Sequence, residues 1–167
     1  MKCAVVGLGI GMAHVAGYLR HPRAELVAVA DAWAPRRAAV GGTFAQGSMK
    51  VLQPLFEPPH LEAGITDLRW EELGVRVYSD ALQVAADPEI DLVSLCTPDD
   101  THEELAIAFL EAGKHLLLEK PLALTEEGAL RVKAAAAAGA AGAEAAAAAA
   151  GGRPPGRQPA PRVSVGY

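Results

Sequence analysis

The stretch Val5–His14, which reads VVGLGIGMAH, places three glycines directly after an apolar run and before a segment of helix-forming residues. This order predicts a β-strand, a tight turn and the start of a helix. A helix N-terminus carries partial positive charge and unpaired N–H groups, and glycines let a pyrophosphate approach the backbone closely. The loop consists of Gly7, Leu8, Gly9, Ile10 and Gly11. It indicates a dinucleotide site, although Met12 stands where a third glycine usually falls, and an ordinary glycine-rich turn also fits.

The composition excludes several classes of partner. The chain has 167 residues, enough for one domain with a core, and its formal net charge of −5 argues against nucleic acid and anionic membranes. No apolar run reaches the length of a membrane span and no signal-peptide pattern precedes the first strand, so we expect a cytoplasmic protein. Cys3 and Cys96 stand in predicted strands without metal-ligand spacing, so we expect buried reduced thiols and no metal site.

Apolar strand-like runs alternate with helix-like segments along the chain. We expect strands at 2–6, 26–30, 76–78, 90–96, 115–118 and 162–167, and helices at 12–20, 80–86 and 101–112 and from Thr125 onward. Leu105, Ala108, Phe109 and Ala112 form the expected inner face of the helix at 101–112. This alternation predicts an α/β fold, a doubly wound parallel sheet of the Rossmann type with strand order 3-2-1-4-5-6.

The domain organisation follows from where this alternation stops. We expect residues 1–133 to form the Rossmann domain, with an inserted segment at about 41–73 rich in glycine and proline. In the tract 134–161, an alanine-rich helix is expected to fade into a Gly/Pro-rich linker. Residues 162–167 are expected to add the last strand of the same domain.

Polar clusters follow four of the predicted strands. They are Gly7–Gly11, Asp31, Thr97–His102 and Glu119–Pro121. Ligands of parallel sheets bind outside the carboxyl ends of the strands, so four clusters on that edge predict a nucleotide crevice.

Asp31 and Arg36 bear on which dinucleotide binds. Asp31 follows the glycines by about 20 residues, where an acceptor for a ribose hydroxyl is expected, although a turn or N-cap aspartate also fits. Arg36 and its neighbour Arg37 could pair with a 2′-phosphate, but a solvated first helical turn explains them as well. The charge of Asp31 therefore favours NAD over NADP.

These residues together resemble one family. The chain is similar to the glucose–fructose oxidoreductase, inositol dehydrogenase and MocA (Gfo/Idh/MocA) family in its N-terminal NAD(P)-binding domain. The resemblance is carried by Val6–Gly11 with His14, Cys96-Thr97-Pro98 with His102, Ala112–His115, Glu119-Lys120-Pro121 and Val163–Tyr167. It covers almost the whole chain except 41–73 and the alanine tract.

The resemblance implies an NAD(P)-dependent oxidoreductase that transfers hydride between nicotinamide and a carbinol carbon of a sugar, cyclitol or related polyol. By the same resemblance, Gly7, Gly9 and Gly11 would hold the pyrophosphate and Asp31 would take the adenosine ribose. Thr97, Pro98 and His102 would border the nicotinamide, and Glu119 and Lys120 would lie beside its ribose. Their neighbours Ile10, Arg36 and Pro121 are further cofactor-binding candidates. Lys120 is the candidate catalytic residue, although a surface lysine at a strand end also fits. His14 is expected to brace the loop, and His102 and His115 fit simple packing.

The chain departs from the family in length, because its members carry a second domain with the substrate pocket. Without that domain we expect dinucleotide binding but little or no turnover, since substrate positioning supplies much of catalysis. Sugar or polyol would then bind only with a second domain. A stand-alone nucleotide-binding or regulatory module, working as a homo-oligomer or with a partner chain, is the alternative, and a degenerate remnant is a third.

Overall fold

A computed structural model describes residues 1–38, 69–149 and 161–166 of the chain. Of the insert expected at 41–73, only its last five residues lie within these ranges. No helix in the described ranges is long and apolar enough to cross a membrane.

A single six-stranded sheet forms the centre of the fold. Its strands are β1 (Lys2–Val6), β2 (Glu25–Ala30), β3 (Arg76–Tyr78), β4 (Leu92–Leu95), β5 (His115–Leu118) and β6 (Val163–Val165). Every neighbouring pair is parallel and the order is β3-β2-β1-β4-β5-β6. The expected fold class and strand order are therefore confirmed.

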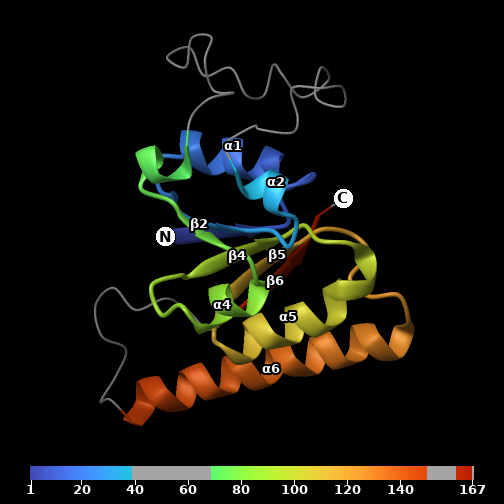
Figure 1. The fold of residues 1–167 in the computed structure, drawn as a ribbon. Coiled ribbons are helices and arrows are strands. Elements are labelled where there is room, and N and C mark those ends of the chain that lie inside the picture. The colour runs from blue at the N-terminus through green and yellow to red at the C-terminus, as the bar shows by residue number, and fades with distance from the viewer. Residues whose placement is uncertain (39–68, 150–160, 167) are drawn as a thin grey trace.

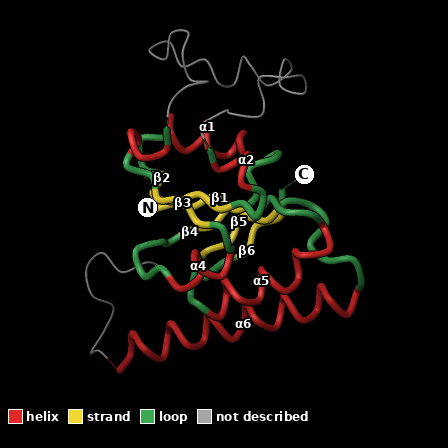
Figure 2. Tube along the Cα trace, in the orientation of Figure 1, coloured by secondary structure: helices red, strands yellow, loops and turns green. Residues whose placement is uncertain are grey.

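Helices cover both faces of this sheet (Figures 1 and 2). On one face lie α1 (Met12–Arg20), α2 (Ala34–Arg37) and the 3₁₀ turn η3 (Trp70–Leu73). On the other lie α4 (Ala81–Ala86), α5 (His102–Glu111) and α6 (Glu126–Ala149), with the 3₁₀ turn η4 (Asp99–Thr101) leading into α5. Each strand of a sheet covered on both faces needs apolar side chains on both sides, which explains the nearly unbroken apolar runs.

Two hydrophobic clusters hold these layers together. Below β1 and β4 in Figure 1, fully buried Phe109 and Leu110 of α5 pack with Val132 of α6 against the sheet. Above it, Val15 of α1 packs with Trp70 of η3 in a second cluster. Trp70 of the expected insert is thus a core residue.

The expected inner face of α5 is partly wrong. Phe109 is buried as expected, but Ala112 is exposed and lies beyond the helix, while Ala106 and Leu110 are buried instead. The buried residues of α5 are His102, Ala106, Phe109 and Leu110, because this helix packs against α6 as well as against β4 and β5.

The last helix runs through the alanine-rich tract. Thr125 caps it, since its Oγ1 accepts the Gly128 N–H at 3.0 Å, and the helix then continues to Ala149. Alanine has the highest intrinsic helix propensity, so the tract stays helical without a patterned apolar stripe. The expected linker at 151–160 lies outside the described residues.

Candidate functional site

The glycine loop, residues Gly7–Gly11, joins β1 to α1 at the carboxyl edge of the sheet. Gly7 has a φ of +89°, and a Cβ there would clash with the Cys96 carbonyl oxygen at the end of β4. A Cβ on Gly11 would clash with the Gly7 carbonyl oxygen and would lie 2.8 Å from Val5 Cγ1. Both glycines are therefore required by the fold itself.

Gly9 has no such requirement. Its φ is not positive, and the nearest atom to a Cβ built there is Arg36 Nη1 at 3.7 Å, an ordinary contact. Neither the backbone conformation nor a steric contact requires glycine at this position. A ligand that approaches the backbone closely explains why glycine stands there.

The backbone N–H groups of the loop provide an anion site. Within the described residues, the N–H groups of Gly9, Ile10 and Gly11 donate no hydrogen bond to the protein. These three groups precede the nine-residue helix α1, whose N-terminus adds partial positive charge. Ile10 is 54% exposed, which places this part of the loop at the surface. The loop therefore fits a pyrophosphate.

Asp31 lies directly beside this loop, at the end of β2. Its Oδ2 accepts the Leu8 N–H at 2.7 Å and its Oδ1 accepts the Trp33 N–H at 2.8 Å. The side chain is nearly buried, and these two bonds fix its orientation. The structure thus brings Asp31 and the glycine loop together, as the sequence predicts, and gives Asp31 a second role in holding the loop.

Arg36 and Arg37 take different positions on α2. The Arg36 guanidinium lies 3.6 Å from Asp31 Oδ2 and 5.2 Å from the centroid of the Trp33 ring, which is itself half exposed. Arg37 instead donates to the backbone carbonyl oxygens of Asp31 and Ala32. Only Arg36 therefore faces the glycine loop.

The segments after β4 and β5 meet through a buried histidine. His102 Nδ1 lies 2.7 Å from the Pro121 carbonyl oxygen, and its Nε2 lies 2.9 Å from the Thr97 carbonyl oxygen. The ring is fully buried, so His102 connects these two segments and has no surface of its own to offer. Thr97 is half-buried, Pro98 is exposed and the Lys120–Pro121 peptide bond is cis.

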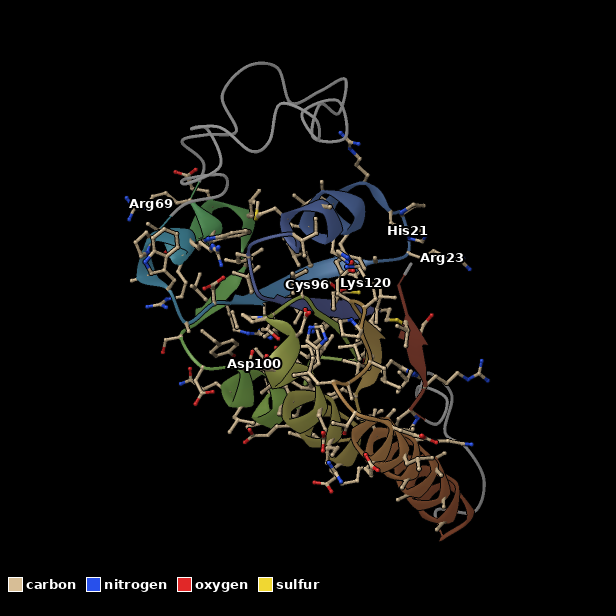
Figure 3. The ribbon with its side chains drawn as sticks, turned by 90° about the vertical axis from the view of Figure 1, so that its right-hand side faces the viewer. His21, Arg23, Arg69, Cys96, Asp100 and Lys120 are labelled. Atoms are coloured by element: carbon tan, nitrogen blue, oxygen red, sulfur yellow. The ribbon has the colours of Figure 1, made fainter. Side chains whose placement is uncertain are left out.

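Glu119 and Lys120 directly follow β5, and they differ in their polar contacts. Glu119 Oε1 lies 3.1 Å from His14 Nε2, whereas the exposed Lys120 side chain has no hydrogen bond or ion pair with the described residues. Figure 3 labels Lys120 and Cys96 near the centre of the carboxyl edge. The Glu119 N–H donates to the Leu95 carbonyl oxygen, so the ends of β4 and β5 lie side by side.

The two thiols do not take part in this site. Burial raises the pKa of Cys96 to about 12, with the charge of Glu119 acting in the same direction, and burial raises the pKa of Cys3 to about 11. Both cysteines are buried and free, as expected. Among the described side chains no group of three metal-ligating residues occurs.

Sequence reasoning missed two residues of the site, Ser94 and Tyr18. Ser94 Oγ lies 3.1 Å from His14 Nδ1 and 2.6 Å from Tyr18 OH. Two signals were present in the sequence: Ser94 is the polar residue of an apolar strand, and Tyr18 follows His14 by one helical turn.

A parallel sheet in this order with an anion-binding glycine loop after β1 defines a dinucleotide-binding Rossmann domain. The family model described as "Oxidoreductase family, NAD-binding Rossmann fold" matches residues 1–141, and the chain belongs to this Gfo/Idh/MocA family. The resemblance stated from the motifs is therefore confirmed.

Individual relatives show which proteins the chain is similar to. Inositol 2-dehydrogenase 2 of Saccharopolyspora erythraea is 49% identical over 65 residues, which is 39% of this chain and 19% of that protein. Myo-inositol dehydrogenase from Lactobacillus casei, solved with NAD(H) and myo-inositol, is 26% identical with a TM-score of 0.59 over 83% of this chain and 33% of that one. Biliverdin reductase from Synechocystis, solved with NADP⁺, is 26% identical with a TM-score of 0.55, over 82% and 34% of the two chains. The match thus spans about a fifth of the first of these proteins and about a third of the two solved chains.

Proposed function

We propose that this chain is the dinucleotide-binding part of an oxidoreductase that acts on a sugar, cyclitol or related polyol. The observation that carries the proposal is the glycine loop, where three N–H groups have no acceptor among the described residues and Gly9 meets no steric need for glycine. The names of the similar proteins, which include inositol dehydrogenases, support the substrate class.

The binding roles follow the positions of the residues. Gly7, Gly9, Ile10 and Gly11 are proposed to hold the pyrophosphate, and Asp31 with Arg36 to hold the adenosine ribose. Thr97, Pro98 and His102 are proposed to border the nicotinamide, the last as a positioning residue, with Glu119, Lys120 and Pro121 beside the nicotinamide ribose. The nicotinamide ring supplies the hydride carrier of such a reaction.

NAD is proposed over NADP because Asp31 is a nearly buried carboxylate at the expected ribose position. A 2′-phosphate there would meet its negative charge, and the nearest cation, Arg36, already lies 3.6 Å from that carboxylate. NADP⁺ in the distantly similar biliverdin reductase shows that the fold itself accepts either cofactor.

Lys120 is the candidate catalytic residue, and we propose that it works only with a substrate-binding part that the described residues lack. Its exposed ammonium has no partner here to hold it at a reacting hydroxyl. The chain alone is therefore expected to bind dinucleotide without efficient turnover, in a cytoplasmic setting. A dinucleotide-binding module that acts with a partner chain is the alternative.

Calorimetric titration with NAD⁺, NADH and NADP⁺ tests the proposal. We expect saturable binding of NAD⁺ and NADH and at least about tenfold weaker binding of NADP⁺. Absence of binding for all three would overturn the proposed function. Formation of NADH from NAD⁺ and a polyol at ordinary enzyme rates would instead overturn the proposed catalytic incompleteness.

A further inference from the structure

A continuous row of hydrogen bonds crosses the fold from α1 to the end of β5. It runs from Tyr18 OH to Ser94 Oγ (2.6 Å), from Ser94 Oγ to His14 Nδ1 (3.1 Å), and from His14 Nε2 to Glu119 Oε1 (3.1 Å). Ser94 is fully buried, and the His14 and Glu119 side chains are only 18% and 24% exposed. Four residues from three elements thus form one connected polar group.

The chemistry of its last member fixes one direction in this row. A carboxylate oxygen only accepts hydrogen bonds, so His14 Nε2 is the donor in the contact with Glu119. Burial raises the pKa of Tyr18 to about 12, and its bond to Ser94 lowers it in part. The Tyr18 and Ser94 hydroxyls each carry one proton, so the contacts on either side of Ser94 both have a donor available.

The row ends on a carboxylate with one oxygen still free. Glu119 Oε1 accepts from His14, while Oε2 accepts no hydrogen bond from the described residues. Glu119 is held next to the end of β4, on the same edge of the sheet as the glycine loop. A carboxylate oxygen fixed in this way is suited to accept a hydrogen bond from a hydroxyl group of a bound ligand.

We propose that His14, Ser94 and Tyr18 are positioning residues that orient Glu119 toward the hydroxyl groups of the nicotinamide ribose. This inference rests on the proposed function and adds to it three residues that determine affinity for that half of the dinucleotide. The three residues contact Glu119 or one another, and the ribose is recognised by Glu119 itself.

A comparison of two ligands distinguishes the positioning of Glu119 from an effect on dinucleotide binding as a whole. ADP contains the adenosine and pyrophosphate alone, whereas ADP-ribose adds the second ribose. We expect His14→Ala and Ser94→Ala to weaken ADP-ribose about tenfold in calorimetric titration, the effect of one hydrogen bond to a charged group, and to leave ADP binding within about twofold. Tyr18→Phe removes only the hydroxyl and should give a smaller loss in the same direction.

Matched variants control for changes in the fold. His21→Ala alters the other histidine of this helix region, which is exposed, and Tyr78→Phe removes a phenol bonded to Asp87. Neither should change the affinity for ADP or ADP-ribose. His14→Gln, whose amide can still donate to Glu119, should retain part of the affinity that His14→Ala loses.

Each possible result of these titrations leads to a different conclusion. Equal losses for ADP and ADP-ribose, or no loss for either, would overturn the positioning role while leaving the proposed function in place. A wild-type chain that binds neither ligand would overturn both. Nitrogen-15 NMR of the unliganded protein adds a readout without ligand: a His14 ring that carries no proton on Nε2 would contradict its bond to Glu119.

Discussion

At the scale of single residues, Gly9 is distinguished from Gly7 and Gly11 because the protein needs no glycine at this position. We expect Gly9→Ala to keep the free energy of unfolding within about 1 kcal/mol of the wild type, since a Cβ there meets only the Arg36 guanidinium. Dinucleotide affinity should fall at least about tenfold, because the methyl group occupies the path of the pyrophosphate. Urea unfolding and calorimetric titration measure the two effects.

Two further glycines serve as controls for this variant. Gly17→Ala lies in α1 with no atom within 4 Å of the new Cβ, and should stabilise the protein by up to about 1 kcal/mol without changing affinity. Gly7→Ala should destabilise by about 2 kcal/mol or more, because of its positive φ and the Cys96 carbonyl. Unchanged NAD⁺ affinity in Gly9→Ala would contradict the assigned loop function.

Asp31 gives the second prediction at this scale. Asp31→Asn removes the negative charge but keeps an acceptor for the Leu8 N–H or the Trp33 N–H. The ratio of NADP⁺ to NAD⁺ dissociation constants should therefore fall about tenfold or more, as titration of both cofactors would measure. Asp80→Asn is the control. It makes the same exchange at the N-cap of α4, where asparagine caps a helix about as well as aspartate does. An unchanged ratio would place the ribose contact elsewhere.

The sequence predicted which strand ends lie together better than it predicted side-chain partners. The three glycines and Asp31 lie side by side as expected, because strand ends in a parallel sheet share an edge. The pairing of His14 with Ser94 and Glu119 joins residues up to 105 positions apart. No local pattern encodes which side chains meet across such distances, so this contact needed the structure.

At the scale of elements, helix starts and stops followed local chemistry where a cap was present. Thr125, the expected start of the last helix, accepts the Gly128 N–H, and Gly113 ends the α5 segment with a φ of +75°. The buried stripe of α5 was predicted only in part. It depends on the packing of α5 against both α6 and the sheet, which no local cap encodes.

The cap of α6 can be tested directly. Thr125→Ala removes the acceptor for the Gly128 N–H and should lower the free energy of unfolding by about 1 kcal/mol, as measured by urea unfolding. Thr125→Ser keeps a hydroxyl and should stay close to the wild type. Equal loss in both variants would mean that the Thr125 methyl group, and not the hydrogen bond, stabilises this helix.

At the scale of the whole molecule, the proposed cofactor site and an ion-pair cluster lie at opposite ends of the strands. The glycine loop lies at the carboxyl ends of the strands, whereas an ion-pair cluster joins the first residues of β1 and β3 to the turn before β4. In this cluster Arg76 contacts Asp87 at 2.7 Å and Glu89 at 2.8 Å, and Lys2 contacts Glu89 at 3.0 Å. Changes in the cluster should therefore affect stability without affecting the cofactor.

The Asp87 carboxylate accepts hydrogen bonds from Arg76, Tyr78 and the Glu89 N–H and makes the stability of the molecule depend on pH. Burial acts to raise the pKa of its carboxyl group, but bonds from the Glu89 N–H, Tyr78 OH and Arg76 outweigh this and lower it. A carboxyl group with a lowered pKa in the folded state contributes stability that is fully present above its unfolded pKa of about 4. That contribution is lost as the pH falls through the folded-state pKa, because protonation removes the charge that Arg76 contacts.

Asp87→Asn tests this dependence. At neutral pH it should lower the free energy of unfolding by about 1–3 kcal/mol, because a half-buried hydrogen-bonded carboxylate is lost. Below about pH 4 the gap between variant and wild type should close, since the wild-type carboxyl group becomes neutral as well. Urea unfolding across this range measures the gap, and NAD⁺ affinity at neutral pH should not change. A gap that is constant with pH would mean that the Asp87 charge does not stabilise the fold, and a loss of NAD⁺ affinity would show that the two edges of the sheet are coupled.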